Sequence, residues 1–379
     1  MVAQPRPLIE VFADLPDFRS PQGKRYELKA ILALACSAML CGYRSYGAIS
    51  QWGRNYGQEL ARVLGFKTGK TPCAATFNAI FRQLDWAQFE TKLNQWAEEV
   101  LSRLGQSEGG EAISLDGKTL RGSRKQGAKS AHLLSALSAR LGVTLLQQAV
   151  EAKTNEIGQV SDLLNGLVME GRIFTMDALL TQEKVAEQIV QGGGDYVMIV
   201  KGNQPSLQAT LAALFEMPSG SLLERPCAQT LDQGHGRIEQ RRIECSTSLT
   251  GYGYWPGLEQ VFRLERTVTT KKTEQQRAEV VYGMTSLTPK RADASRLLSL
   301  VRGHWAIENG SHWVRDVTFD EDRSQVRVGN IPQVMASLRN LVIGLLRQAG
   351  ETNIAAACRR MAAQPWSALA MIGITQKTE

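Results

Sequence analysis

Several signals that mark specialised classes of protein are absent from this sequence. The longest mainly apolar run, Leu28 to Cys41, covers only about fourteen residues and contains Lys29, which is too short to span a bilayer. The six cysteines form no CxxC pair and keep no regular spacing, so neither a zinc cluster nor a disulfide framework is indicated. The N-terminal segment MVAQPRPLIEVF is interrupted by proline and lacks the apolar core of a signal peptide. We therefore expect a reduced, cytoplasmic setting without membrane contact.

The composition is that of a globular chain with room for two or three domains. Of 379 residues, 43% are hydrophobic and 21% are charged, which argues against extensive disorder. The net charge is +7 and the pI is near 9.1, an excess that favours an anionic partner. Residues 1–70 hold ten Lys or Arg against five Asp or Glu. This asymmetry suggests a nucleic-acid-binding module at the N-terminus, although a solvated basic face would also produce it.

Residues 1–105 show helical periodicity and form the first expected domain. Apolar spacing predicts helices over Tyr26 to Cys41, Tyr46 to Asn55 and Phe89 to Leu104. Between the last two we expect another helix, with Thr71 as its N-cap. The apolar face of that helix consists of Phe77, Ile80, Phe81 and Leu84.

Two of these helices, with the polar turn between them, resemble a helix-turn-helix. The second helix would leave Thr76, Asn78 and Arg82 free to meet a DNA groove. Helix pairs of this kind also occur as plain packing units, so both interpretations stay open at this point.

From residue 111 the pattern changes to strands that alternate with helices, which predicts a mixed α/β sheet over residues 111–217. The segment AISLDGKTLRG is a short apolar strand ending in Asp116, and a basic turn follows it. Two more strands flank a turn at residues 140–142, and the later strand RIFTMD ends in Asp177. Both aspartates therefore lie near carboxyl ends of strands, where such sheets place their sites.

Residues 218–287 interrupt this alternation. The segments RIEQRRIECS, QVFRLERTVTT and AEVVYGMTS alternate apolar with charged residues, as half-exposed antiparallel strands do. We predict an all-β insertion here. The second part of the α/β core should follow over residues 288–350, and a C-terminal tail over residues 351–379.

The stretch VRGHWAIENGSHWVRDVTFDEDR, residues 301–323, is the most informative part of the chain. On an α-helix, the side chains of His304, Glu308, His312 and Arg315 would fall within a narrow arc beside an apolar stripe. Glu308 would then lie at the edge of a buried face. A solvated helix carboxylate would show the same spacing. A metal site on successive helical turns is a further alternative, although the HExxH pattern is absent.

Three carboxylates, Asp116, Asp177 and Glu308, come from two strand ends and one expected helix. Held together, they would form an all-oxygen site suited to Mg²⁺. Paired divalent ions about 4 Å apart can activate a water or a 3′-hydroxyl on one side of a phosphodiester and stabilise the leaving oxygen on the other. This arrangement of carboxylates favours metal-dependent chemistry on a nucleic-acid backbone.

Four segments carry a family resemblance: SLDGKTLRGS, TMDALLTQ, GGDYVMIVKGNQP, and HWAIENGSHWVRDVTFDED with the following RVGN. Together they resemble the DDE transposases of bacterial insertion sequences, in the subgroup that includes the H-repeat-associated proteins. The resemblance runs from about Leu8 to about Arg347. It implies an RNase H-like core and cleavage and transfer of DNA strands that depend on Mg²⁺, with Mn²⁺ as a substitute. It also implies that Asp116, Asp177 and Glu308 are the catalytic and metal-binding residues.

The resemblance further implies that the partner is double-stranded DNA at transposon terminal inverted repeats, bound near the nucleoid by a homodimer that brings two ends together. The residues expected to contact DNA are Arg82, Lys118, Arg121, Lys201, Arg237, Trp255, Arg302, His304, His312 and Arg315. Related transposases with a β-insertion often carry a Tyr, an Arg and a Lys around the glutamate. Here Val301, His304 and Arg315 occupy those positions, so this part of the pattern is not kept.

Two features of the insertion remain open in the sequence. The segment DQGHGRIEQR, with His235 and Arg237, matches a motif of the subgroup, and a turn that orders the insertion would explain it equally. Trp255, in GYGYWPGLE, is expected by resemblance to stack on an unpaired base near the cleavage site. Packing within the sheet is the alternative, because tryptophan usually buries its large area.

Three functions from different classes fit these features. The first is a transposase that cuts and joins transposon ends, and the second is a DNA-binding protein derived from a transposase with an idle core. The third is a metal-dependent nuclease that cuts without joining. The intact carboxylate set argues against the second, and an assay for joining separates the first from the third.

Overall fold

The structure, a computed structural model, describes residues 6–375 apart from 106, 108, 125–129, 151–155, 219–224, 235, 252, 254 and 306. The chain divides into two compact units, each assembled from separate stretches of sequence. The first unit holds Met1–Gly105, Gly117–Glu151 and Glu308–Glu379, and the second holds Gln106–Asp116 and Ala152–Ile307. This division differs from the consecutive segments expected from the sequence, because stretches far apart along the chain pack together.

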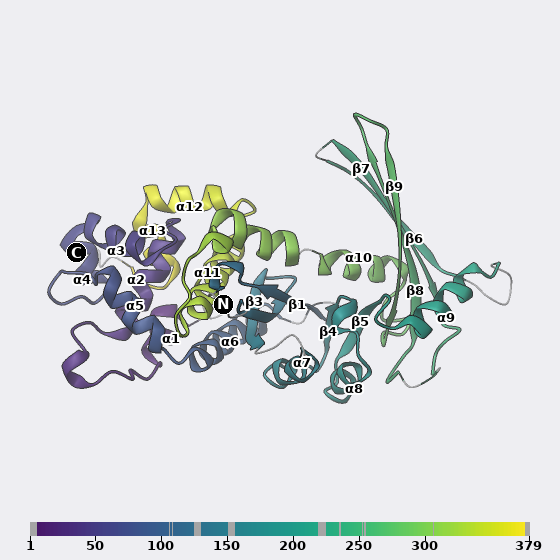
Figure 1. Ribbon diagram of the computed structural model, residues 1–379, viewed down its shortest axis with the longest axis horizontal. Coiled ribbons are helices and arrows are strands. Elements are labelled where there is room, and N and C mark those ends of the chain that lie inside the picture. Colours follow the sequence, from purple (N-terminus) through teal and green to yellow (C-terminus); the bar gives the residue numbers. More distant parts are fainter. Residues whose placement is uncertain are drawn as a thin grey trace. The chain divides into compact units, whose positions relative to one another are not determined.

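The first unit is built around helix α2, in which every residue except Lys29 is buried. A helix that is apolar on all sides must be covered on all sides, and α1, α3, α11, α12 and α13 pack against it (Figure 1). The helices of this unit are α1 (Leu8–Ala13), α2 (Leu28–Leu40), α3 (Tyr46–Asn55), α4 (Gly57–Val63), α5 (Ala74–Gln83), α6 (Trp86–Arg103), α11 (Ile331–Gln348), α12 (Ile354–Ala363) and α13 (Pro365–Met371).

The helices expected in residues 1–105 are confirmed, with a correction at the start of α5. This helix begins at Ala74 with Cys73 at its N-cap position, so the prediction that Thr71 caps it was wrong. Thr71 precedes Pro72, which disfavours helical backbone, and the Pro72 carbonyl accepts a hydrogen bond from Ser50 Oγ at 2.9 Å. The predicted apolar face is confirmed, because Phe77, Ile80, Phe81 and Leu84 are all buried.

The connection between α3 and α5 is longer than the turn of a helix-turn-helix. Helix α4 lies within it, where the sequence had suggested only a polar turn. Gly57 takes a φ of +75°, which separates α4 from α3 at little cost for glycine. Leu60 and Ala61 then anchor α4 by burial. The exposed side chains of Asn78 and Arg82 on α5 remain where the sequence placed them.

Residues 351–375, the described part of the expected C-terminal tail 351–379, are folded, which corrects that expectation. Helices α12 and α13 bury Ile354, Cys358 and Leu369. The carbonyl of Ile372 also accepts a hydrogen bond from the backbone N–H of Ile9 at 3.1 Å. The two ends of the described chain therefore belong to one helical core.

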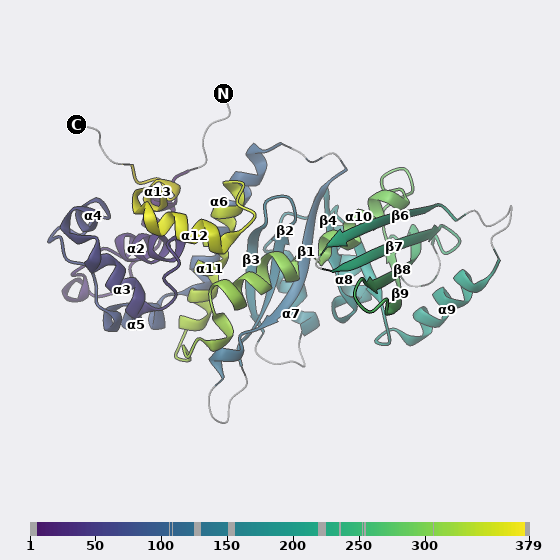
Figure 2. The same cartoon turned by 90° about the horizontal axis from the view of Figure 1, so that it is seen from above.

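Strands β2 (His132–Ser138) and β3 (Val143–Val150) form the antiparallel pair predicted around residues 140–142. Gly142 supplies the positive φ of the turn, +61°. Helices α6 and α11 pack against β3 (Figure 2). The first unit is therefore a helical assembly that covers a β-hairpin.

The second unit combines parallel and antiparallel strands with four helices among its described residues. Strands β1 (Glu111–Thr119), β4 (Arg172–Met176) and β5 (Asp195–Val200) run parallel, and β9 pairs antiparallel with β5. The helices are α7 (Glu156–Asn165), α8 (Glu183–Gln191), α9 (Pro205–Glu216) and α10 (Ala294–His304). Strand β1 has residues in both units, and the nine described strands are hydrogen-bonded in the order β3-β2-β1-β4-β5-β9-β8-β7-β6. The protein is thus a mixed α/β protein with a large mixed sheet.

The predicted β-segment over residues 218–287 is present, and it continues the sheet of the core. Its strands are β6 (Cys227–Gly234), β7 (Arg237–Ser246), β8 (Gln260–Thr270) and β9 (Gln276–Thr285) (Figure 1). Strand β6 was not expected, because it lies at the sheet edge and lacks a buried apolar face. Gly283 of β9 lies directly over the ring of Phe262, where any side chain would collide.

Two expectations about the whole chain can be checked on the described residues. All six cysteines lie among the described residues and are free thiols. No described helix combines the length and the apolar character that crossing a membrane requires.

Glu90 of α6 is a buried carboxyl in the first unit. It accepts hydrogen bonds from the backbone N–H of Gln147 at 3.1 Å and from Gln147 Nε2 at 3.2 Å, and it contacts Ser337 Oγ. Ser337 Oγ also accepts from Trp86 Nε1 at 2.9 Å and lies 3.0 Å from the Gln333 carbonyl. The Ser337 hydroxyl has one hydrogen, which it can donate either to the Gln333 carbonyl or to Glu90. If Glu90 carries a proton, Glu90 can donate to Ser337 Oγ while Ser337 donates to Gln333, so that both contacts are hydrogen bonds. Burial raises the pKa of Glu90 to about 7.

We predict that Glu90 makes the protein less stable as the pH rises. The folded-state pKa lies above the ordinary value of 4.5, so its stabilising contribution is complete below pH 4.5 and is lost as the pH rises through 7. Between pH 5 and pH 8 the free energy of unfolding should fall by about 2–3 kcal/mol from this group. In urea unfolding, Glu90→Gln should remove this decline, whereas the exposed control Glu59→Gln should keep it. A decline that persists in Glu90→Gln would assign it to other groups.

Candidate active site

Three charged side chains lie near the carboxyl ends of the parallel strands in the second unit. Leu115 of β1 is in register with Met176 of β4, so Asp116 and Asp177 are the next residues on neighbouring strands. Adjacent strands bring such residues to roughly 5 Å between Cα atoms. Lys201 directly follows β5, and its Nζ lies 3.1 Å from Asp177 Oδ1. One correction applies, because β1 continues to Thr119 and Asp116 lies inside the strand rather than at its end.

The Asp177 carboxylate is held in its charged form. Burial would raise its pKa, but hydrogen bonds from the Ala178 backbone N–H and from Lys201, together with the charge of Lys201, hold the pKa below the ordinary 3.8. The side chains of Asp177 and Lys201 are both about half exposed, at 52% and 47%. Asp177 is therefore an ionised carboxylate paired with a half-exposed ammonium group.

A row of buried polar side chains connects the two strands that carry the aspartates to α10. His304 Nδ1 lies 3.1 Å from Thr175 Oγ1, and Thr175 Oγ1 donates to Ser114 Oγ at 3.1 Å. Burial lowers the pKa of His304 to about 4, so the ring is neutral at pH 7. The expectation that His304 contacts DNA phosphate was therefore wrong, because His304 is buried and links α10 to β4.

Glu308 does not lie on the α-helix that its spacing had suggested. Helix α10 ends at His304, and the segments Glu308–His312 and Val314–Thr318 are π-helical. Side chains five residues apart follow one another in a π-helix, so the predicted arc of four residues is not formed. Glu308 is exposed, and Trp313, five residues later, is 56% exposed.

Arg315 belongs to a buried ion-pair cluster rather than to a DNA surface, which corrects its expected role. Glu321 accepts from Arg315 Nε at 2.8 Å and from Arg339 Nη1 at 2.8 Å. The three side chains are at most 3% exposed. Burial alone would raise the pKa of Glu321, but the two guanidinium groups hold it below the ordinary 4.5. The cluster ties the π-helical segment to the 3-10 turn Glu321–Arg323 and to α11.

The other residues expected to contact DNA differ in how accessible they are. Lys118 is only 8% exposed and pairs with Asp316 at 2.6 Å, so it is not available to a phosphate. Arg302 is partly exposed and pairs with Asp232 at 2.9 Å. The exposed residues are Arg82, Arg121 and Arg237, while His312 and Trp255 are half-buried. His235 lies outside the described residues.

Several residues of the first unit that pair with the expected DNA-contacting residues, or that lie near Glu308 in the sequence, were not predicted. Trp313 and the pairing carboxylates Asp316 and Glu321 were not singled out. The signal was present in the acidic run FDED, which supplies partners for nearby basic residues. Among the described residues, no three His, Cys, Asp or Glu side chains form a group that could hold a metal ion. Asp116 and Asp177 carry carboxylate oxygens, the type of ligand that Mg²⁺ prefers, on neighbouring strands.

Comparison with known families identifies the class of this chain. The family model described as "Transposase DDE domain" matches residues 107–345, and the model "DDE_Tnp_1-associated" matches residues 9–97. The protein belongs to the DDE transposase family. It carries both the DDE domain and the associated N-terminal region of that family.

Two relatives from Escherichia coli are similar over most of their length. "Putative transposase YncI" of strain O157:H7 is 30% identical, over 90% of this chain and 87% of that protein. "H repeat-associated putative transposase YhhI" of strain K12 is 29% identical, over 89% of this chain and 90% of that protein. These relatives confirm the resemblance to the subgroup of H-repeat-associated proteins. A solved structure titled "Cryo-EM structure of piggyBac transposase synaptic complex with hairpin DNA (SNHP)" aligns with a TM-score of only 0.42 at 9% identity, covering 98% of this chain and 81% of that chain.

We predict that the ion-pair cluster is essential for the stability of the first unit. Glu321→Gln removes the carboxylate that both buried guanidinium groups contact, and breaking such a pair costs about 3–5 kcal/mol. The free energy of unfolding, measured in urea at pH 7, should fall by this amount. The control Glu279→Gln alters a carboxylate that is 58% exposed and lies 3.9 Å from Arg266, and it should change stability by less than about 1 kcal/mol. Equal losses in the two variants would contradict the assignment.

Proposed function

We propose that this protein is an active transposase that cleaves insertion-sequence DNA ends and joins them to a target with divalent metal ions. The observation that carries the proposal is the register that makes Asp116 and Asp177 neighbours on parallel strands, within the matched DDE domain. We infer an RNase H-like core over β1 to β5 with α10, into which β6 to β9 are inserted. Glu308 is proposed as the third catalytic carboxylate.

Asp116, Asp177 and Glu308 would hold Mg²⁺ or Mn²⁺. When bound, such ions activate a water or a 3′-hydroxyl and stabilise the leaving oxygen of a phosphodiester. Two features of the chain would support metal binding at these carboxylates. Asp177 is kept ionised, and Lys201 neutralises it at the exposed end of the sheet. The hydrogen bonds that join Ser114, Thr175 and His304 fix the two strands that carry the aspartates.

The proposed partner is double-stranded DNA at the terminal inverted repeats of the element, bound by a homodimer in the cytoplasm at the nucleoid. Exposed or partly exposed cations that would meet its phosphates include Arg82, Arg121, Lys201, Arg237 and Arg302. Trp255 stays a proposed stacking residue, although it is only partly exposed. Trp313 has the more accessible ring and follows Glu308 by one π-helical turn.

We predict that Asp177→Ala abolishes cleavage of DNA carrying the native element ends. Loss of a metal ligand removes several kcal/mol of transition-state stabilisation, a fall on the order of 10³-fold in rate. DNA affinity should change by less than about twofold. Asp116→Ala and Glu308→Ala should behave alike, whereas Asp162→Ala, an exposed aspartate on α7, should cleave normally.

A ligand-exchange variant tests the metal directly. In Asp177→Cys the softer sulfur should favour Mn²⁺ over Mg²⁺, so cleavage should return in part with Mn²⁺ alone. Near-normal cleavage by Asp177→Ala would remove this residue from the catalytic set. Strand joining should accompany cleavage in the native protein; cleavage without joining would make it a nuclease, and binding without either would make its core idle.

We predict that Arg82 contributes a DNA contact from the exposed face of α5. If it meets a phosphate, Arg82→Ala should weaken binding to all DNA sequences and lower the slope of log affinity against log salt by about one. Lys184→Ala, an exposed cation on α8, is the control and should leave the slope unchanged. A loss confined to the native end sequence would indicate a base contact instead. An unchanged affinity would show that α5 does not face DNA.

A further inference from the structure

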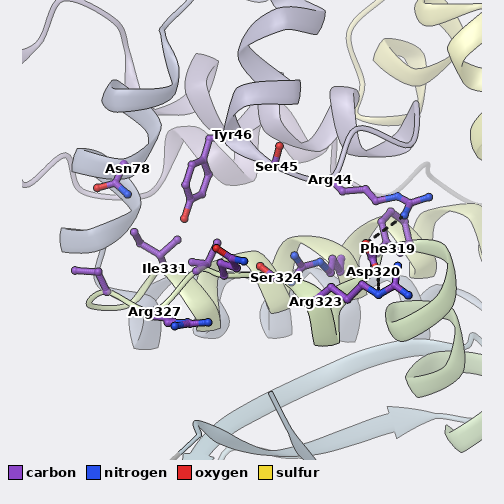
Figure 3. A pocket seen from close by; sticks show the side chains of 14 residues that line it. Arg44, Ser45, Tyr46, Asn78, Phe319, Asp320, Arg323, Ser324, Arg327 and Ile331 are labelled. Atoms are coloured by element: carbon purple, nitrogen blue, oxygen red, sulfur yellow. Dashed lines mark ion pairs between the residues drawn. The ribbon is translucent and has the colours of Figure 1, made fainter. Parts of the chain in front are cut away.

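A pocket of about 430 Å³ opens in the first unit, and none of the residues proposed for catalysis line it (Figure 3). Its walls are the start of α3 with Arg44 and Tyr46, Asn78 of α5, the segment Phe319–Val328 and the start of α11. In Figure 3 the ring of Tyr46 extends from α3 toward the opposite wall, while Arg44 and Arg323 converge at one end. This volume is typical of a small-ligand site.

The walls of the pocket carry more positive than negative charge. Arg44 and Arg323 both approach Asp320, at 4.0 Å and 3.7 Å, and Arg327 lies farther along the wall. One carboxylate is thus shared by two guanidinium groups. Arg323 is 86% exposed and Arg44 is 49% exposed, so both can turn toward a ligand. Arginine forks match the oxygens of phosphate in two-pronged contacts.

A buried charge behind the wall adds to this excess. Arg339 lines the pocket with a side chain that is 3% exposed, and it shares Glu321 with Arg315. Two buried cations and one anion leave a net positive charge in the interior, which is costly without a further anion. Among the described residues, Arg339 Nε has no hydrogen-bond partner. An anion in the pocket would supply the balancing charge.

Backbone groups reinforce the same preference. Helix α3 begins at Tyr46 and helix α11 begins at Ile331, and both residues line the pocket. Helix N-termini carry partial positive charge. The N–H groups themselves are partly used, because Ile331 N–H bonds to the Val328 carbonyl, Pro332 has no N–H, and Ala48 N–H bonds to Ser45 Oγ. The wall is also fixed in place, because Gly329, at a φ of +55°, leaves no room for a side chain beside the Arg82 carbonyl. Its neighbour Asn330 donates to the Leu84 carbonyl at 2.8 Å.

The pocket is larger than a phosphate and partly apolar. Tyr46, Phe319 and Ile331 provide carbon surface next to the arginines. Burial raises the pKa of Tyr46 to about 12, so its hydroxyl remains a hydrogen-bond donor at neutral pH. A ligand with one anionic end and one flat apolar end would fit both parts of the lining.

We infer that this pocket binds one nucleotide unit of a DNA strand, with its phosphate on Arg44, Arg323 and Arg327 and its base or sugar against Tyr46. Arg339 attracts the phosphate from behind the wall. The identification of DNA as the source of the nucleotide rests on the proposed function. The chemistry of the pocket, a phosphate joined to a nucleoside, rests on the lining alone.

The test uses the full-length protein and four probes: dAMP, deoxyadenosine, inorganic phosphate and a single-stranded oligonucleotide. Binding of the small probes is followed by ligand-observed NMR. dAMP should bind more tightly than either half of it, and the oligonucleotide should displace it. Arg44→Ala and Arg327→Ala should each weaken dAMP binding by about tenfold. Tyr46→Ala should weaken dAMP but leave phosphate binding unchanged.

A matched control is available on the same helix as Tyr46. Arg54 is exposed near the other end of α3, about 12 Å away by helix rise, so Arg54→Ala removes the same charge outside the pocket. It should change dAMP affinity by less than about twofold. Equal losses in Arg54→Ala and Arg44→Ala would overturn the site, because charge alone would then explain binding.

Two other outcomes would overturn parts of the inference. Phosphate binding as tightly as dAMP would reduce the pocket to an anion site, and dAMP that the oligonucleotide cannot displace would make its ligand a free nucleotide. Asp177→Ala separates these results from the proposed function, because it should bind dAMP normally. If Asp177→Ala loses cleavage but still binds dAMP, the result concerns catalysis alone. If the native protein cleaves DNA but does not bind dAMP, only the proposal for the pocket is rejected.

Discussion

The arrangement of the first unit depends on one carboxylate, that of Glu321, between the guanidinium groups of Arg315 and Arg339. The ion pairs join the π-helical segment Val314–Thr318, which follows Glu308 in the sequence, to the long helix α11. Glu308 itself is exposed and has little packing of its own to hold it in place. Its position within this unit is therefore set by the buried residues that follow it, above all Arg315. A charged cluster of this kind is costly to bury, but it is geometrically demanding, and that makes it suited to fixing one arrangement of three segments.

The same unit contains a second buried glutamate with the opposite electrostatics. Glu90 is surrounded by hydrogen-bonding groups without a positive charge in direct contact, so burial dominates and its proton is retained up to about pH 7. Glu321 lies between two cations, so attraction dominates and its carboxylate stays ionised. The first group favours folding at low pH, and the second favours folding once its carboxyl has lost its proton. Residue type and burial alone would not have distinguished them, because the deciding factor is the charge of the nearest side chains.

The sequence was sufficient to predict the aspartates of the candidate site but not the surroundings of Glu308. Asp116 and Asp177 follow short apolar strands, and local periodicity is enough to place such residues near one sheet edge. The arc of His304, Glu308, His312 and Arg315 assumed α-helical geometry, and the π-helical turns changed which side chains point inward. Strand β6 escaped notice because an edge strand has no buried face to impose an alternating pattern. Helices α12 and α13 were taken as a tail because both pack against α2, which is far away in sequence.

Basic residues are the hardest to interpret from sequence, and this chain shows why. Lys118 and Arg315 were expected to contact DNA, yet both are buried in ion pairs. Lys118 pairs with Asp316, and Arg315 pairs with Glu321. Arg44 and Arg323 were not singled out, yet they remain accessible because they share a single carboxylate, Asp320. Whether an arginine is a structural partner or a free cation depends on how many carboxylates the fold brings to it. The positive excess of residues 1–70 and the arginines after Glu308 meet within the first unit. The proposed affinity for anions would therefore belong to that assembled unit, rather than to the N-terminal segment in which the charges were first counted.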